Sequence, residues 1–391
     1  MSARIAFDDG LLAEDCLTGV PGVRLRRLAP ADAAALAAGL NDLEVAKNLV
    51  AVPHPYGADD AATFLRGPAA SPHMLCAGLW VEDSFAGCVA IDATAGFPEL
   101  GYWLVRAHWG RGIVSAATRA LVDLAFAATA IEKIVSGHFV DNAASAAVLR
   151  KLGFKPAGIV ETRSRARAEP VRLVAMNLER EAWAAGRPTI ETARLVMRPP
   201  LMADAEEIAA LANDGGLPLT TAATPRVRRP EEARGFVLQA LRRGFPADAS
   251  FCMRLRESGA LIGGIGWRDA GADEVELGYW LGADHRGVGL ATEAARAALE
   301  AAFETTGAAT VKACCRPINP ASRGVLERCG FQWSGAGHMR PQASGGSVPV
   351  DRFRLERDVF YSLKAWGAAA IRTGAAPQAR ADALSRAADR A

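Results

Sequence analysis

The chain has 391 residues and half of them are hydrophobic, so its length predicts two or three domains with cores of ordinary size. A net charge of +2 provides no general field for nucleic acid or for an anionic membrane. The seven cysteines show no zinc-type spacing, and no long apolar run predicts a membrane span. We therefore expect a reduced, cytoplasmic protein without a nucleic-acid or membrane partner, and no metal is implied.

The first half of the chain predicts one domain at 21–181, preceded at 1–20 by a leader or a surface strand. Alternating apolar residues mark its strands, and apolar residues at helical spacing mark its helices. The expected order is strand, helix, helix, three strands, helix, strand, helix, and a pair of strands that ends near 179. Up to that pair, the elements are expected near residues 23–28, 32–41, 58–66, 74–82, 86–92, 99–104, 115–128, 133–139 and 142–153.

The second half of the chain repeats the first. Glu99–Leu104 and Glu276–Leu281 both read ELGYWL, at an offset of 177 residues. The same offset relates Gly112 to Gly289, Asn142 to Asn319, Ser145 to Ser322, Leu149 to Leu326, and Gly153 to Gly330. The offset stays constant through strand-like, Gly-rich and helical sequence, which indicates two copies of one domain.

The second copy is expected at 191–366, after a linker at 182–190 and before a helical or disordered tail at 367–391. The order of strands and helices indicates an α+β fold with a mixed sheet in each copy. The sequence leaves open whether the two copies pack as an internal pseudo-dimer.

A Gly-rich turn joins the repeated strand to the next helix. In copy two it reads Arg286-Gly287-Val288-Gly289-Leu290-Ala291-Thr292. Small residues let backbone N–H groups converge at a helix start, where unpaired donors and the helix dipole favour an anion such as a pyrophosphate. The alternative is a tight strand-to-helix turn that binds no ligand.

This arrangement resembles the GNAT superfamily of acyl-CoA-dependent N-acyltransferases, whose Arg/Gln-x-x-Gly-x-Gly/Ala loop matches Arg286–Ala291 at every defined position. The ELGYWL strand, the Trp-Gly-Arg-Gly-Ile turn of copy one, and Asn-x-x-Ser followed by Gly-Phe resemble its Rim-type branch, which acetylates N-terminal amines of ribosomal proteins and includes enzymes for small amines. The resemblance implies two tandem domains, each with a sheet splayed open at a coenzyme A cleft. It also implies acetyl-CoA as donor and a primary amine, on a protein N-terminus or a small molecule, as acceptor.

By the same resemblance, both copies offer residues for coenzyme A. In copy two they are Trp280, Leu281, Arg286, Gly287, Val288, Gly289, Leu290, Ala291, Thr292 and Asn319. In copy one they are Trp103, Leu104, Arg111, Gly112, Ile113, Val114, Ser115 and Asn142. Copy one departs from the family loop, with Trp109 in place of Arg or Gln and Val114 in place of Gly or Ala, so we expect it to bind coenzyme A weakly or not at all.

The resemblance also suggests catalytic candidates. Many members carry a Tyr acid seven residues after the Asn; here that position is Leu149 or Leu326, so Ser145 and Ser322 are the candidates to protonate the leaving thiolate. Glu99 and Glu276, at the start of the repeated strand, are either bases for the amine or solvated, ion-paired carboxylates. Both Asn residues are either pantetheine contacts or ordinary helix caps.

The remaining chemistry-bearing side chains have structural explanations. Cys314 and Cys315 lie mid-strand and are expected to be buried structural thiols. Of each aromatic pair, Tyr102 with Trp103 and Tyr279 with Trp280, one ring is expected to reach the cleft. The competing function is a non-catalytic scaffold or acyl-CoA-binding protein, and a dehydrogenase is disfavoured because the turn lacks a third Gly and a following acidic residue.

Overall fold

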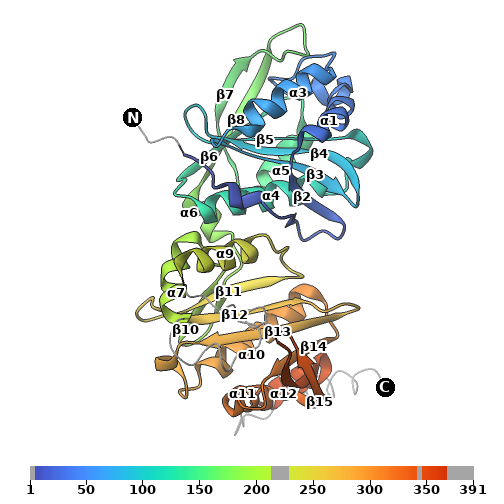
Figure 1. The fold of residues 1–391 in the computed structure, drawn as a ribbon. Coiled ribbons are helices and arrows are strands. Elements are labelled where there is room, and N and C mark those ends of the chain that lie inside the picture. The colour runs from blue at the N-terminus through green and yellow to red at the C-terminus, as the bar shows by residue number, and fades with distance from the viewer. Residues whose placement is uncertain (1–4, 213–228, 341–345, 368–391) are drawn as a thin grey trace, which may run out of the picture.

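The computed structural model describes residues 5–212, 229–340 and 346–367, which form two domains packed end to end (Figure 1). The predicted tail beyond Gly367 lies outside the described residues, as does the predicted helix end near Asn213. No helix within the described ranges is both long enough and apolar enough to span a membrane.

Domain 1 follows the predicted order of strands and helices. Its elements are β1 (Cys16–Leu17), β2 (Val23–Arg27), α1 (Ala33–Leu40), α2 (Leu43–Ala46), α3 (Ala58–Arg66), β3 (Met74–Val81), β4 (Ser84–Asp92), β5 (Glu99–Leu104), α4 (Ile113–Ala128), β6 (Lys133–Phe139), α5 (Ala143–Leu152), β7 (Lys155–Thr162), β8 (Val171–Glu179) and α6 (Arg180–Ala185).

Domain 2 repeats this order. Its elements are β9 (Ile190–Glu191), β10 (Leu195–Arg198), α7 (Ala205–Ala212), α9 (Pro230–Leu241), β11 (Ala249–Leu255), β12 (Leu261–Asp269), β13 (Glu274–Leu281), α10 (Leu290–Thr306), β14 (Thr310–Cys315), α11 (Pro320–Arg328), β15 (Gln332–Met339), β16 (Val348–Glu356) and α12 (Arg357–Gly367).

The two sheets have one topology. Within the described residues each has eight strands, in the orders β1-β2-β3-β4-β5-β6-β8-β7 and β9-β10-β11-β12-β13-β14-β16-β15. Only β5 with β6, and β13 with β14, pair in parallel. The predicted α+β fold with a mixed sheet is therefore confirmed in both copies.

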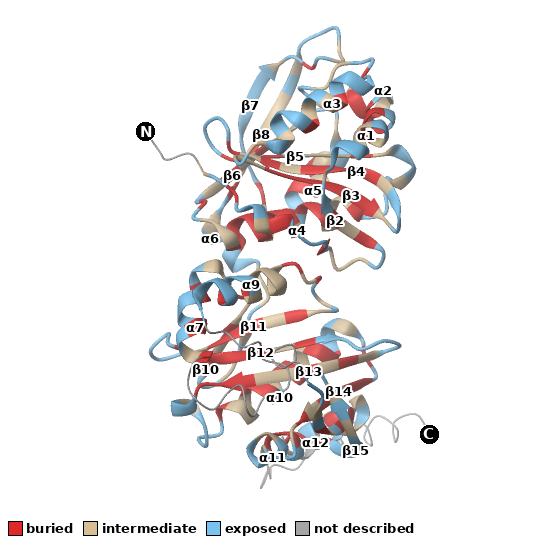
Figure 2. Cartoon of the chain, viewed as in Figure 1, coloured by how far each residue is buried: buried red, intermediate tan, exposed pale blue. Residues whose placement is uncertain are grey.

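Helices cover both faces of each sheet, and the buried residues concentrate between these layers (Figure 2). In domain 2, α10 packs one face through an alanine-rich stripe that includes Ala294, Ala298 and Ala302, all fully buried. Small side chains let the helix approach the strands closely. The opposite face is covered by α7 and α9, which pack around Trp280.

Each sheet opens where its two parallel strands diverge. In domain 2, β13 and β14 remain paired from Glu274 with Thr310 to Leu277 with Ala313. In domain 1 the parallel pairing is reduced to Glu99 with Val135. Among the described strands none pairs with the β14 side of residues 278–281, so backbone groups of β13 line an opening through the sheet.

The segments at the domain ends extend beyond their predicted limits. Residues 5–20, set apart by the sequence as a leader or surface strand, contribute buried Phe7, Leu11 and Leu12 to the domain 1 core, and β1 pairs with β2. Within the predicted linker, α6 packs back on domain 1 because the Trp183 ring stacks on Phe126 at 4.9 Å. The connection between the folded domains is accordingly shorter than 182–190.

The end of α9 joins domain 2 to the N-terminal segment of domain 1. Arg242 is only 8% exposed, its Nε donates to the Leu11 carbonyl at 3.2 Å, and it also binds the Gly10 carbonyl and the Glu14 carboxylate. In return, the Arg242 carbonyl accepts a hydrogen bond from the Leu17 N–H at 2.7 Å. Leu238 and Leu241 of α9 pack against the domain 1 core.

This contact joins unlike faces. Helix α4 of domain 1 lies against α9 of domain 2, whereas the counterpart of α4 is α10 and the counterpart of α9 is α3. A two-fold pseudo-dimer would repeat this contact in reverse, with α10 of domain 2 against α3 of domain 1, and no packing comparable to that of α4 with α9 joins those helices in the described residues. The packing of these elements is head-to-tail instead.

Arg242→Ala is expected to lower the free energy of unfolding by about 2 kcal/mol, because buried carbonyls and a carboxylate lose a charged donor. Arg243→Ala is the matched control: the Arg243 side chain is more exposed, and we expect a change near zero. Urea denaturation followed by tryptophan fluorescence measures both variants. Equal losses in the two variants would contradict the anchoring role of Arg242.

Candidate functional site

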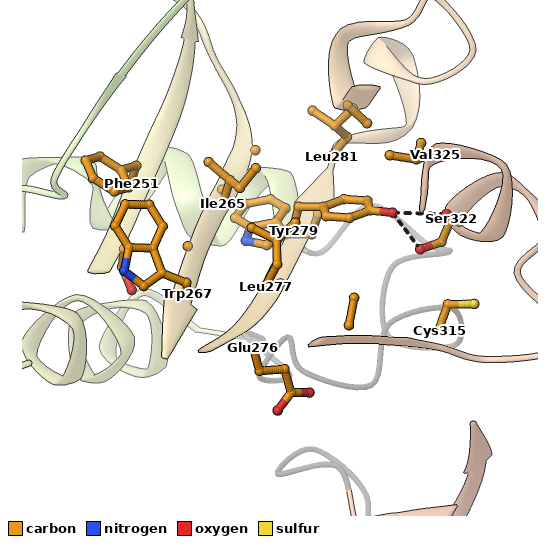
Figure 3. Close-up of a pocket in the computed structure, with 18 of the residues that line it drawn as sticks. Phe251, Ile265, Trp267, Glu276, Leu277, Tyr279, Leu281, Cys315, Ser322 and Val325 are labelled. Atoms are coloured by element: carbon orange, nitrogen blue, oxygen red, sulfur yellow. Dashed lines mark hydrogen bonds between the residues drawn. The ribbon is translucent and has the colours of Figure 1, made fainter. Parts of the chain in front are cut away.

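A cavity of about 750 Å³ passes through the opened sheet of domain 2 (Figure 3). It is lined on one side by Ile208 of α7 and Phe236 of α9, and on the other by Leu290 and Ala291 of α10. Because these helices cover opposite faces of the sheet, the cavity connects the two faces past β13.

The predicted phosphate loop forms one end of this cavity. Gly287 and Gly289 have φ values of 80° and 83°, a left-handed conformation that glycine adopts without strain. Gly289 is the N-cap of α10, so the first N–H groups of that helix face the cavity end without an intrahelical acceptor. Arg286, Leu290, Ala291 and Thr292 also line the cavity, whereas the Val288 side chain is 59% exposed.

Arg286 has a structural task at this turn. Its Nε and Nη2 donate to the Leu281 carbonyl at 3.1 and 3.0 Å, closing the end of β13. In domain 1, Trp109 Nε1 donates to the corresponding carbonyl, that of Leu104, at 2.7 Å. The Trp109 departure from the family pattern therefore keeps the same hydrogen bond but supplies no positive charge.

A second brace occurs in domain 2 alone. The Glu293 carboxylate in the first turn of α10 accepts from Thr192 Oγ1 at 2.6 Å and from Arg194 Nε at 2.6 Å. Arg194 also donates to the Val288 carbonyl at 2.9 Å. Although burial opposes it, hydrogen bonds from Thr192 and Arg194 lower the pKa of Glu293. The corresponding residue of α4 in domain 1 is Ala116, which cannot form this brace.

The remaining cofactor candidates of domain 1 lie around the start of α4, as their counterparts in domain 2 lie around the start of α10. Gly112 caps α4 with a φ of 74°, and exposed Arg111 contacts His108 at 3.2 Å. Ile113 is buried, and Val114 is partly buried against the domain core. Leu104 and Leu281 are buried, and their carbonyls accept the hydrogen bonds from Trp109 and Arg286. Ser115 is partly buried in the first turn of α4.

A tyrosine and a serine meet at the middle of each cleft. The Tyr279 hydroxyl lies 3.0 Å from Ser322 Oγ and donates to the Ser322 carbonyl at 3.1 Å (Figure 3). Tyr102 lies 2.8 Å from Ser145 Oγ in the same way. Burial raises the pKa of Tyr102 to about 12 and that of Tyr279 further, against a smaller opposing effect of the serine. Both phenols therefore remain protonated at neutral pH.

This pair changes the prediction of which group protonates the leaving thiolate. We expected Ser145 and Ser322 to act without a tyrosine, because Leu149 and Leu326 occupy the family position. The structure brings a phenol to each serine from β5 and β13 instead. The signal was present in the strand period: Tyr279 shares a face with Leu277 and Leu281, which point towards α10.

The two asparagines cap helices. Asn142 Oδ1 accepts from the Ser145 N–H at 3.0 Å, and Asn319 Oδ1 accepts from the Ser322 N–H at 3.1 Å. Asn142 Nδ2 also donates to Asn48 at 3.1 Å. The capping alternative is thus realised, and a pantetheine contact stays a prediction.

The two glutamates have different surroundings. Glu276 lines the cavity and accepts from Arg268 Nη2 at 2.5 Å, an ion pair across β12 and β13. Glu99 instead faces Asp92, and burial together with that charge raises the Glu99 pKa. The ion-pair alternative therefore holds for Glu276, which also forms a side-chain hydrogen bond with Cys314.

Both aromatic residues of domain 2 line the cavity, where we expected one. Tyr279 faces α10, while Trp280 packs against α7 and α9. The expectation was wrong because the cavity passes through the sheet and reaches both of its faces. In domain 1, Trp103 packs near Phe85, with ring centroids 5.9 Å apart. Cys315 is buried as expected, whereas Cys314 is only partly buried, and both line the cavity. Burial raises the pKa of each thiol to about 11.

On the α9 side, glycines form the floor of the cavity. Gly264 and Gly266 of β12 and Gly278 of β13 line it, and a Cβ on Gly264 would meet the Trp280 ring at 2.6 Å. The strand registers place Cys88 and Ala90 of domain 1 at the positions of Gly264 and Gly266. Domain 1 therefore carries side chains at two positions where domain 2 has none.

The chain matches known proteins along both halves. The model of the acetyltransferase (GNAT) domain matches residues 23–155 and again 194–332. "Putative ribosomal N-acetyltransferase YdaF" of Bacillus subtilis is 29% identical over 145 residues, which are 35% of this chain and 79% of that protein. "Uncharacterized N-acetyltransferase p20" of Bacillus licheniformis is 29% identical over 94 residues, 24% of this chain, and the match spans about half (53%) of that protein.

Solved structures give the same family name. A GNAT-family acetyltransferase from Bacillus anthracis is 22% identical, with a TM-score of 0.39, and the match covers 44% of this chain and 99% of that one. The two matches to one domain model together cover more than half of this chain. The chain therefore belongs to the GNAT acetyltransferase family, and it contains the domain twice in tandem.

Proposed function

We propose that the protein transfers an acetyl group from acetyl-CoA to a primary amine, on a small molecule or a protein N-terminus, with domain 2 as the working site. The observation that carries this proposal is the continuous cavity of domain 2. It joins the N–H groups at the start of α10, the Tyr279 and Ser322 pair, and the Glu276 carboxylate. An anion site, an acid and a proton acceptor then lie along one strand.

The chemistry follows from these groups. The amine nitrogen attacks the thioester carbonyl while both substrates are bound, so proximity supplies much of the acceleration. Backbone N–H groups on the open side of β13 stabilise the negative charge that develops on the carbonyl oxygen. When the carbon–sulfur bond breaks, Tyr279 donates a proton to the thiolate, and Ser322 relays or orients that proton.

The amine must lose a proton as the amide forms. Glu276 is the proposed acceptor, directly or through water, because it lines the cavity and Arg268 holds it in place. Glu276→Gln is expected to lower kcat about tenfold, with the KM for acetyl-CoA unchanged. Glu99→Gln, at the same position of domain 1, is the matched control and should leave kcat unchanged. A kcat unaffected by Glu276→Gln would assign the proton to solvent.

Domain 1 is proposed to act mainly as a support. It lacks the glutamate of the domain 2 brace, its floor carries Cys88 and Ala90, and it anchors Arg242 of α9. We place the protein in the reducing cytoplasm because all seven cysteines are free thiols.

The direct test is thiol release from acetyl-CoA in the presence of a panel of primary amines, with acetylated products identified by mass spectrometry. Amine-dependent release with a matching product supports the enzyme. Tight acetyl-CoA binding without any amine-dependent release would favour the non-catalytic alternative, an acyl-CoA-binding protein.

A further inference from the structure

The cavity of domain 2 has two chemically different ends. The phosphate loop follows Leu281, at the end of β13, whereas Glu276 lies five residues earlier on the same strand. At about 3.3 Å per residue, these ends are about 17 Å apart. A donor whose phosphates bind at the loop therefore leaves the Glu276 end to the acceptor.

Arg243 belongs to the Glu276 end. It lines the cavity just beyond the end of α9, together with Phe236 and Gln239 of that helix. The chain after Arg243 leads to Ala249, which pairs with Trp267, and Trp267 Nε1 donates to the Pro246 carbonyl at 2.8 Å. Trp267 is in turn paired with Leu277, next to Glu276.

The neighbouring residue, Arg242, holds the backbone at Arg243 in place. Its neighbour Arg242 is buried against domain 1 by hydrogen bonds to the Leu11 and Gly10 carbonyls and by an ion pair with Glu14. Of these two adjacent arginines, Arg242 binds domain 1 and Arg243 lines the cavity of domain 2.

The acceptor end carries an excess of positive charge. The charged residues that line the whole cavity are five arginines and one carboxylate: Arg243, Arg268, Arg286, Arg328, Arg340 and Glu276. Arg268 is neutralised by Glu276, while neither Arg243 nor Arg340 forms an ion pair with a carboxylate of the described chain. A guanidinium binds carboxylate and phosphate groups through two parallel hydrogen bonds.

We propose that the acceptor of domain 2 is a primary amine that also carries an anionic group, a carboxylate or a phosphate, and that Arg243 binds this group. The glycine floor leaves room for the acceptor between α9 and the strands, and its amine faces Glu276 and the open edge of β13. This inference rests on the proposed function and specifies its substrate class.

The test uses the full chain and matched acceptors, with kcat/KM calculated on the neutral amine. Alanine, alaninamide and ethylamine form the carboxylate arm, and phosphoethanolamine with ethanolamine forms the phosphate arm. In one of the two arms, the anionic amine is expected to have a kcat/KM about tenfold higher than that of its neutral partners. The arm that shows this preference identifies the anion as a carboxylate or a phosphate.

Arg243→Gln is expected to remove this preference by raising the KM for the anionic acceptor, with the KM for acetyl-CoA unchanged, and Arg243→Lys should restore part of it. Arg234→Gln, on α9 but outside the cavity lining, is the matched control and should keep the preference. Equal kcat/KM values for neutral and anionic amines would overturn the inference and leave the proposed function standing. Absence of acetylation with every amine would overturn both.

Discussion

Ala291→Asp is expected to abolish coenzyme A binding by domain 2, with Kd raised about a hundredfold or more. Ala291 is the second residue of α10 and lines the cavity at its phosphate end. A carboxylate there would face two linked phosphates at the N-terminus of the helix. Isothermal titration calorimetry with coenzyme A measures the change.

The charge effect can be separated from a folding effect. Ala291→Asn has nearly the same shape without the charge and should bind far better than Ala291→Asp. A carboxylate in the first helical turn favours the helix itself, so the aspartate variant is expected to fold. Val114→Asp, at the corresponding position of domain 1, should leave the domain 2 binding event unchanged. An undiminished affinity of Ala291→Asp would refute the phosphate site.

Tyr279→Phe is expected to lower kcat about a hundredfold, because the leaving thiolate loses its proton donor. The KM for acetyl-CoA should stay near the wild-type value, since the ring that packs in the cleft is retained. Tyr102→Phe in domain 1 is the matched control and should have no effect on turnover. Steady-state thiol release with a saturating amine measures both variants.

The pH profile provides a further check on Tyr279. Because burial raises the pKa of this phenol, the acid stays protonated beyond the range in which an ordinary tyrosine ionises near pH 10. Loss of activity from tyrosine ionisation should therefore begin only above that pH. If the two residues act as one unit, the double variant Ser322→Ala and Tyr279→Phe should have a kcat little lower than that of either single variant. Additive losses would separate their roles.

Much of the fold could be predicted from the sequence because its information is local. The ELGYWL strand, the glycines at the helix start and the apolar periods of α4 and α10 each lie within one element or one turn. The duplication also presented each pattern twice, so a residue required by the common fold could be told from one retained in a single copy. The topology then followed from the order of strands and helices.

The site contacts that were missed join residues far apart in the chain. Tyr279 and Ser322 are 43 residues apart and meet only because β13 and α11 lie on the same side of the opened sheet. Arg194 reaches Glu293 across 99 residues. The strand period indicates which face Tyr279 shares, but the partner that each side chain meets depends on how the elements pack, which a single sequence without relatives does not specify.

The head-to-tail contact between unlike faces has a consequence for self-assembly. A contact of this kind can be repeated along identical units, and the repeats form a ring if the rotation closes and an open fibre if it does not. Here the repetition stops after one step, because the residue that follows α9 is the anchoring Arg242, whereas the residue that follows α3 is Gly67. We therefore expect the divergence between the copies to keep further chains from repeating this contact.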